Sequence, residues 1–477
     1  MSSKCTSKSK QWLSYVTLEP MWMLGMTGMG MRALVSSGGL ERAVCWKLYA
    51  DDLAIRCEHK STYTDEADYN IQQEMADWDI YTTLAYLLPA IFANVILGSW
   101  SDSIGRQLNM VVSLSGLAVS ALGMVLVFSS TLRAPLILLV LFACISGVTG
   151  FVAMLGGASY AYIADITPNK RFQSIRMAIL NSLGVLAGAA GAFTVSTMSE
   201  SLSFSGQADM ITITGFFAVL CAIFLTYQIP PQLLKQTDDD LIIVEQSPIS
   251  DVQKTRNLAT FLVQVVHLIL DAFRAYTKPR EGHRRAFLVC LAVVLFIYCS
   301  KGSEPVAQYT FRKGNGGLEW DVAQLGQWIT VSNILSMLVS GLGMVLLKLL
   351  KVRDTTICIA ALASVTLRWI VIGLATQTWH MYLAALIGSV QDMATAGLIS
   401  FMAQLVEPNE VGKVFTVVGI SYETSAILGK VIFNSVYKAT LAVLPGFMFF
   451  LGSFLMIICI VLCLWIHIVS KRENIGH

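Results

Sequence analysis

Charged side chains are scarce in this chain of 477 residues, where Asp, Glu, Lys and Arg together make up 13%. Soluble domains carry about 25% charged residues, so the composition excludes an ordinary soluble protein. The formal net charge is only +2, which gives no indication of nucleic acid as a partner. We therefore expect a lipid bilayer around most of the chain.

Several motifs that carry chemistry are also missing. No G-x-x-x-x-G-K-[ST] loop occurs, which excludes ATP hydrolysis as the power source. Neither H-E-x-x-H nor G-x-S-x-G occurs, and metal-ligating side chains do not cluster in the sequence. We therefore expect no enzymatic activity, no cofactor and no metal. The absence of any N-x-[ST] acceptor predicts that the chain carries no N-linked glycan.

Apolar runs dominate what is present, since 55% of the residues are hydrophobic. A membrane helix needs about 20 apolar residues, whereas strands of a membrane barrel alternate in polarity. The runs are continuous, and about twelve of them are long enough to span a bilayer. We predict an all-α membrane protein with twelve transmembrane helices, near residues 14–38, 80–101, 107–129, 135–164, 174–198, 209–230, 286–303, 323–348, 355–376, 380–405, 412–437 and 443–469.

Two long polar segments divide the chain. Residues 39–79 form an acid-rich segment that we predict to be an outer loop, and residues 231–285 form a polar linker after the sixth helix. The predicted organisation is a six-helix half over 1–230 and a second over 286–477. Lys and Arg concentrate in the linker and in alternate loops, so both termini and the linker are predicted to be cytoplasmic.

A short charged turn joins the second and third predicted helices. Gly98, Asp102, Gly105 and Arg106 lie within nine residues, with the acid and the base one helical turn apart. They can pair with each other or with a helix end. The alternative is a solvated turn that only separates two helices.

A second charged cluster follows the fourth predicted helix, and it consists of Asp165, Arg171 and Arg176. It repeats the pattern of the first turn, and we predict a gating role for it as well. A solvated loop is the alternative.

The first turn resembles the G-x-x-x-D-x-x-G-R loop of the Major Facilitator Superfamily, and further stretches resemble its solute carrier family 46. The matching stretches are Glu19-Pro20, Leu97 to Arg106, Ala158 to Asp165, Arg176-Met177-Ala178, Leu405-Val406-Glu407 with Gly412, and Phe433 to Tyr437 with Thr440. The resemblance implies the fold of that superfamily, a charge relay through Asp102 and Arg106 that closes the cytoplasmic side, and transport of organic anions, often with a proton.

Four positions depart from the family's proton-coupled folate transporters. Where those have ionisable residues, this chain has Phe151, Asn181, Cys299 and Ile399. These departures favour another substrate, such as a muropeptide or a cyclic dinucleotide. Folate transport remains an alternative.

Ionisable groups inside membrane spans are costly unless they are paired or hydrated, so each is a candidate for a site. Arg32, Arg368 and Lys430 are the predicted substrate-binding cations, and Asp392 and Glu423 the predicted proton-coupling acids. The alternative is that these groups pair with one another to hold helices together, or extend to the membrane interface.

Most of the ten cysteines lie in apolar runs, but Cys45 and Cys57 share the polar segment after the first helix. They are the candidate disulfide if that segment is extracellular. The family's usual partner cysteine is missing from residues 303–322.

Three glycines recur along the fifth predicted helix, namely Gly184, Gly188 and Gly191. Small residues at such spacing let two membrane helices approach closely. We predict a close helix contact along this face.

Together these patterns predict a secondary transporter that moves an organic anion or peptide-like solute by alternating access, as a symporter if a proton is coupled. A small-molecule substrate, protons and the lipid bilayer are the expected partners. A receptor or scaffold that keeps the fold without transporting is the competing class. We expect the plasma membrane, with a lysosomal or endosomal membrane as the alternative.

Overall fold

The computed structural model describes residues 18–49, 57, 63–166, 170–199, 201–228, 267, 270–301, 305–313, 317–407 and 410–473. Within these ranges the chain is built from helices and the turns between them. The first group is α2 (Glu19–Tyr49), α3 (Asp65–Ile104), α4 (Arg106–Phe128), α5 (Ile137–Val148), α6 (Phe151–Ile166), α7 (Lys170–Met198) and α8 (Phe204–Gln228). The second is α10 (Arg284–Cys299), α11 (Val306–Phe311), α12 (Val322–Leu349), α13 (Asp354–Gly373), α14 (Thr378–Ile387), the 3-10 turn η4 (Gly388–Val390), α15 (Met393–Gln404), α16 (Val411–Thr440) and α17 (Phe447–Arg472).

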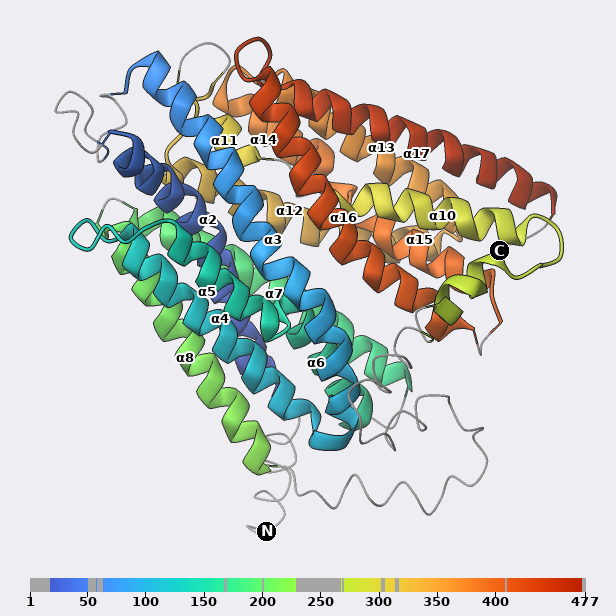
Figure 1. The fold of residues 1–477 in the computed structure, drawn as a ribbon. Helices are drawn as coiled ribbons and strands as arrows, with labels where there is room; N and C mark the ends of the chain where they lie inside the picture. Colours follow the sequence, from blue (N-terminus) through green and yellow to red (C-terminus); the bar gives the residue numbers. More distant parts are fainter. Residues whose placement is uncertain are drawn as a thin grey trace, which may run out of the picture.

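The two groups form two bundles (Figure 1). In the first, α4 packs against α8 and α2 against α7; in the second, α13 packs against α17 and α10 against α16. The bundles contact each other through α7 with α12 and through α3 with α16. They lie together at the upper left of Figure 1 and diverge toward the right.

The two ends of the molecule are named here by what they carry. The disulfide end holds the bond between Cys45 and Cys57, whose Cα atoms are 5.6 Å apart. The linker end holds the turn at Gly105 and residues 270–283, which precede α10.

Ten helical segments of the described chain are long and apolar enough to cross a membrane. Two further predicted spans, α2 and α10, lie in the same bundles without meeting that description. The α10 helix has only 16 residues, and α2 is interrupted by charges such as Arg32, Glu41 and Arg42. Large apolar side chains face outward elsewhere, among them Phe92, Leu342 and Phe224 at 69%, 66% and 61% exposure. Such a surface suits lipid as the surrounding solvent.

Glycines bring α2 and α7 into backbone contact. A Cβ placed on Gly30 would lie 2.0 Å from the carbonyl oxygen of Gly188, and one on Gly191 would lie 2.1 Å from that of Thr27. At both places only a hydrogen fits. The close contact predicted from the glycine spacing is confirmed for this helix pair.

The segment at 39–79 is not a loop throughout its length, which corrects the sequence prediction. Residues 39–49 continue α2 and residues 65–79 begin α3. The acidic side chains at Asp65, Glu66 and Asp68 sit in the first turn of α3, where negative charge stabilises a helix N-terminus. The polarity of residues 39–79 therefore indicates that they lie outside the apolar spans, but it does not indicate that they lack helical structure.

Two predicted spans, 135–164 and 380–405, are each broken in the middle. The first separates into α5 and α6, and the second into α14, η4 and α15. Hydropathy does not detect these breaks because the residues on both sides are apolar.

Candidate functional site

The two broken helices occupy corresponding places, each being the fourth span of its bundle. Between α5 and α6 the backbone turns at Gly150 (φ 86°) and Phe151 (φ 52°). A Cβ on Gly150 would lie 2.6 Å from Cβ of Met154 and 2.7 Å from Oδ1 of Asn94, so glycine is required there. Paired interruptions of this kind point to the binding site of a transporter.

A cavity of about 470 Å³ lies between the bundles beside the first break. It is called the central cavity below. Its lining includes Arg32 of α2, Asp79 of α3, Phe151 of α6, Arg368 of α13 and Lys430 of α16. The structure thus brings the three predicted substrate-binding cations into one space, although they are far apart in the sequence.

Arg32 and Arg368 each contact an aromatic ring of this cavity. The guanidinium carbon of Arg32 lies 5.9 Å from the ring centroid of Phe151, and Arg32 donates to the hydroxyl of Ser120. The corresponding carbon of Arg368 lies 5.5 Å from the ring centroid of Trp328. An aromatic face attracts a cation electrostatically, which compensates part of the solvation that a buried cation loses.

Neighbouring polar groups fix Arg368 in place. Its Nη1 donates to Oε1 of Gln391 over 2.8 Å, within the second helix break. Trp328, which supplies the ring, donates its Nε1–H to the carbonyl of Met381 over 2.8 Å. Gly388 packs against the same side chain, since a Cβ on it would lie 2.4 Å from Cδ of Arg368. The second break therefore positions this cation.

Asp79 is a site residue that the sequence prediction missed. Its Oδ2 is 2.7 Å from Nζ of Lys430 and accepts hydrogen bonds from Nδ2 of Asn434 at 3.0 Å and Nε2 of Gln308 at 3.2 Å. Asp79 comes directly before the apolar run at 80–101, so it counted as part of the polar loop. No Gly or Pro separates Asp79 from the apolar run at 80–101. This continuity could have predicted that Asp79 lies on the same helix.

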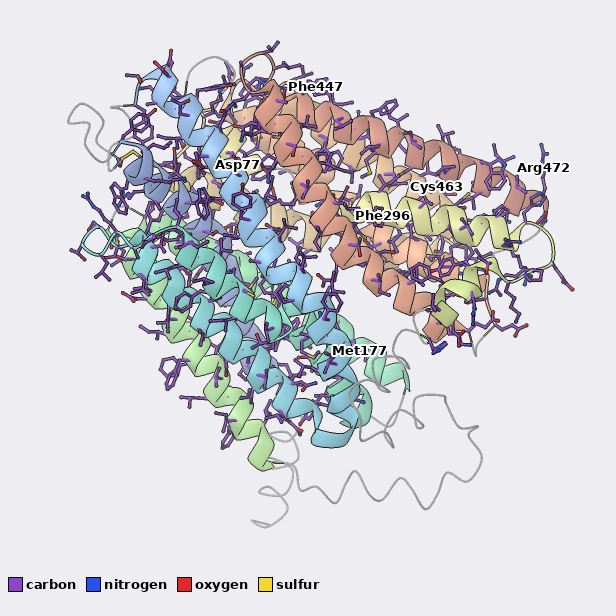
Figure 2. All side chains as sticks on the ribbon, in the orientation of Figure 1. Asp77, Met177, Phe296, Phe447, Cys463 and Arg472 are labelled. Atoms are coloured by element: carbon purple, nitrogen blue, oxygen red, sulfur yellow. A yellow bond between two sulfur atoms is a disulfide. The ribbon has the colours of Figure 1, made fainter. Side chains whose placement is uncertain are left out.

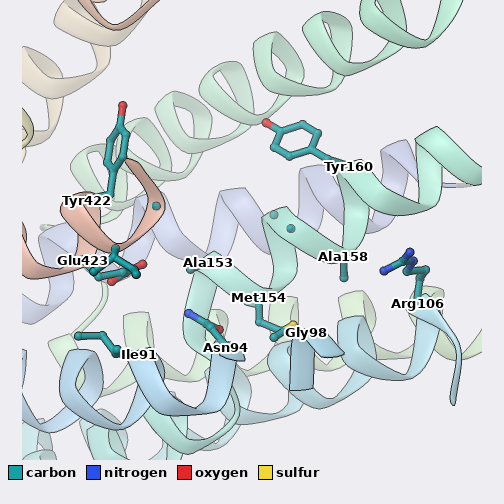
Figure 3. A pocket seen from close by; sticks show the side chains of 14 residues that line it. Ile91, Asn94, Gly98, Arg106, Ala153, Met154, Ala158, Tyr160, Tyr422 and Glu423 are labelled. Carbon is teal, nitrogen blue, oxygen red and sulfur yellow. The ribbon is translucent and has the colours of Figure 1, made fainter. Parts of the chain in front are cut away.

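A second cavity, of about 820 Å³, opens between α3, α6 and α16, and it is called the linker-end cavity below. Figure 3 shows Glu423 and Tyr422 on α16 across from Asn94 and Met154, with Arg106 farther along. Glu423 therefore lies in a different cavity from the three cations, although it is seven residues from Lys430.

Asp392, the other predicted proton-coupling acid, lines neither cavity. It is the residue before α15, its carboxylate pairs with Nζ of Lys301 at 2.9 Å, and its side chain is 54% exposed. Lys301 in turn donates to the hydroxyl of Tyr298. This arrangement fits the pairing alternative better than a buried proton site.

The predicted gate residues lie at the linker end. Gly105 has φ 112° and forms the turn between α3 and α4, while Gly98 and Arg106 line the linker-end cavity. A Cβ on Gly98 would meet no atom within 4 Å, so this glycine faces open space. Arg176 lies 3.6 Å from the carboxylate of Glu19. The side chains of Asp102, Asp165 and Arg171 fall outside the described part of the structure.

The disulfide end, by contrast, is tied across the two bundles. Asp77 of α3 pairs with Lys438 of α16, and Figure 2 places Asp77 where these helices meet. Oδ2 of Asp68 accepts the backbone N–H of Lys313 over 3.0 Å. With the Asp79 contacts, these ties close the disulfide end, while the linker-end cavity reaches between the bundles from the opposite side.

Comparison with known proteins shows similarity over most of the chain. The family model described as Major Facilitator Superfamily matches residues 62–430. The proton-coupled folate transporter of Bos taurus is 23% identical over 89% of this chain and 87% of its own length. The probable peptidoglycan muropeptide transporter SLC46 of Drosophila melanogaster is 26% identical over 82% of this chain and 74% of its own.

A third relative is the lysosomal proton-coupled steroid conjugate and bile acid symporter SLC46A3 of Rattus norvegicus. It is 25% identical over 86% of this chain and 85% of its own length. Among solved structures, the nucleoside transporter NupG superposes with a TM-score of 0.62 at 13% identity and covers 95% of this chain and 98% of its own. The xylose transporter XylE of E. coli gives 0.58 at 16% identity, covering 94% and 97%. These structures share the fold.

Proposed function

Because the chain belongs to the Major Facilitator Superfamily and is a secondary transporter of the membrane, we propose that it moves an organic anion through the central cavity by alternating access. The observation that carries this proposal is the convergence of Arg32, Arg368 and Lys430 on that cavity. The described lining holds a single carboxylate, Asp79, so the charge of this lining is +2. Cations inside a bilayer are costly and persist where they serve a site.

The shape of the cavity refines the substrate class. Tyr86, Phe151 and Trp328 contribute aromatic faces to the lining, and the rings of Tyr86 and Phe151 stack with centroids 4.5 Å apart. A solute with a flat or apolar body and one or two anionic groups fits such a lining. Cyclic dinucleotides, steroid conjugates and folate combine these features, whereas a muropeptide shares the anionic groups on a polar sugar–peptide body.

Proton coupling is the proposed energy source, and Glu423 is the better of the two predicted acids. Its carboxylate faces the linker-end cavity among mostly apolar neighbours, whereas Asp392 is paired with Lys301. The names of the relatives support a symporter, since two of the three relatives compared above are named as proton-coupled.

We assign the disulfide end to the outside and the linker end to the cytoplasm. A disulfide forms in an oxidising compartment, and the basic loops of the sequence lie on the opposite side. The proposed gate at Gly98, Asp102, Gly105 and Arg106, with Asp165, Arg171 and Arg176, would then close the cytoplasmic side. Plasma and lysosomal membranes both satisfy this assignment.

An uptake panel tests the proposal. Labelled folate, a muropeptide, a cyclic dinucleotide and a steroid sulfate are offered at pH 5.5 and 7.5 to cells that express the chain and to cells that do not. We expect saturable uptake of at least one anion, greater at the lower pH. Uptake that is equal in both cell lines for every anion would contradict the proposal.

A further inference from the structure

Asp79 connects the two bundles through three donors that all belong to the second bundle. The carboxylate comes from α3, while Lys430 and Asn434 come from α16 and Gln308 from α11. Each of the three contacts has to break before α3 and α16 can separate at the disulfide end. A charged hydrogen bond of this kind is stronger than a neutral one, so Asp79 contributes to this closure together with the Asp77–Lys438 pair.

The pair between Asp79 and Lys430 also faces the central cavity. Both residues line it, and the side chains of Asp79 and Lys430 are 21% and 18% exposed. A solute inside the cavity can therefore reach the ammonium group of Lys430. That ammonium is the same group that holds the carboxylate of Asp79.

We propose that Asp79 is an internal substitute for the anionic group of the substrate. In the empty cavity Asp79 holds Lys430 and stabilises the closed disulfide end together with the pair of Asp77 and Lys438. A bound anion takes over Lys430, which releases Asp79 and allows α3 to move away from α16. This inference rests on the proposed anion transport and adds to it the step by which the substrate opens one side.

The mechanism satisfies a thermodynamic requirement. A ligand shifts a conformational equilibrium only if it interacts differently with the two states. An anion that competes with Asp79 interacts differently with the closed and open states. Its contact with Lys430 replaces a contact that exists only in the closed state. A neutral solute has no such advantage and leaves the disulfide end closed.

The test measures how fast a membrane-impermeant thiol reagent labels a cysteine at the interface of the bundles. Ser196 is suitable for this cysteine because it is 4% exposed and bonds the carbonyl of Ala323 across α7 and α12. The Ser196→Cys protein is labelled in intact cells, with the unsubstituted chain as background. Ser201→Cys, exposed on the turn between α7 and α8, shows that the reagent reaches the disulfide end.

We expect Asp79→Asn and Lys430→Gln to accelerate labelling by about tenfold, because each substitution removes an ion pair that only the closed state makes. The charge-swapped protein with Asp79→Lys and Lys430→Asp should return to slow labelling. Glu74→Gln is the matched control, since Glu74 on α3 pairs with Lys47 inside the first bundle, and its labelling should not change.

Labelling of Asp79→Asn at the parent rate, with normal amounts at the cell surface, would overturn the closure. If Asp79→Asn fails to reach the surface, Gln308→Ala removes one donor and decides the question by the same readout. An anion of the panel that is taken up should accelerate labelling of the parent and not of Asp79→Asn. Equal acceleration in both would overturn the competition, whereas absence of any uptake would contradict the proposed function and leave the closure to be judged by the variants alone.

Discussion

Arg368 shows how a single cation is prepared for an anion in the apolar interior. It donates to Gln391 and lies over the ring of Trp328, so its guanidinium group is oriented before any solute arrives. Preorganised groups lose less entropy on binding than mobile ones. A planar guanidinium also offers two parallel donors to a carboxylate or phosphate, which a lysine does not.

Replacing Arg368 should therefore act on substrate affinity. We expect Arg368→Ala to raise the apparent KM about tenfold or more, because a hydrogen bond to a charged group contributes about 1.5–3 kcal/mol. Arg368→Lys should raise it less. Uptake kinetics measure both, with Arg274→Ala as control, since Arg274 is exposed and pairs with Asp271 one turn away on the same helix. Unchanged KM in Arg368→Ala would remove this residue from the site.

Gly388 offers a way to move Arg368 without changing its charge. A methyl group at this position would lie 2.4 Å from Cδ of Arg368, so Gly388→Ala has to displace that side chain. We expect a KM between those of the wild type and Arg368→Ala. Gly341→Ala is the control, because a Cβ there meets nothing within 4 Å. Equal kinetics for both alanine variants would show that the position of Arg368 does not matter.

At the scale of the helix, the contact of α2 with α7 depends on residues that lack a side chain. Gly30 and Gly191 each allow a backbone carbonyl of the other helix to approach within the space that a Cβ would fill. In a bilayer such close packing is a main source of helix association. Here the sequence pattern was sufficient, because the small residues repeat along one face of α7.

A methyl group at Gly191 should push the two helices apart. We expect Gly191→Ala to lower the thermal stability of the detergent-solubilised protein, at a cost of about 1–3 kcal/mol for overpacking. Gly28→Ala on α2 should leave the stability unchanged, because a Cβ there meets no atom within 4 Å. The Tm of each variant is measured from the fraction of protein that remains monodisperse in size-exclusion chromatography after heating. An equal Tm for Gly191→Ala and Gly28→Ala would contradict the packing account.

Residues 270–283 form another element-scale contact, at the linker end. Residues 270–277 are helical, the hydroxyl of Tyr276 donates to the carbonyl of Val414, and Lys278 and Arg280 both pair with Glu410 before α16. The hydrogen bond from Lys278 and the pairing with Arg280 lower the pKa of Glu410. Since the pKa is lowered on folding, this pairing stabilises the contact above the ordinary pKa and is lost only as the pH falls through the lowered value.

Removing that charge should release the segment at neutral pH. We expect Glu410→Gln to accelerate trypsin cleavage after Arg274 and Arg280, because residues 270–283 lose both of their ion pairs to Glu410. Glu407→Gln, at an exposed neighbouring position, should be cleaved at the wild-type rate. If Glu410→Gln is cleaved no faster than Glu407→Gln, the pairing does not hold this segment.

For the whole molecule, the sequence predicted the all-helical membrane fold, the resemblance to solute carrier family 46 and a secondary transporter, and each of these is confirmed. Apolar runs and short motifs carry this information locally, which is why it could be predicted. The helix breaks at Gly150 and Gly388 could not, since neither changes the hydropathy of its segment. The count of twelve spans stays a prediction, because α2 and α10 are less apolar or shorter than the other ten.

The arrangement of the site was harder to predict than its members. Arg32, Arg368 and Lys430 were selected because charges inside membrane spans are costly, but only the folded chain shows that they line one cavity. Asp79 was missed because α3 begins earlier than its apolar run. Glu423 and Lys430 share a face of α16 and nevertheless line different cavities, because that face passes along both.

The central claim is that the central cavity selects its solute by negative charge. Uptake of a transported anion is compared with uptake of its neutral ester in vesicles that hold the wild type, Arg32→Gln or Arg368→Gln. The account predicts that the wild type takes up the anion and not the ester, and that either substitution reduces uptake of the anion. Equal uptake of anion and ester by the wild type, with no loss in either variant, would contradict it.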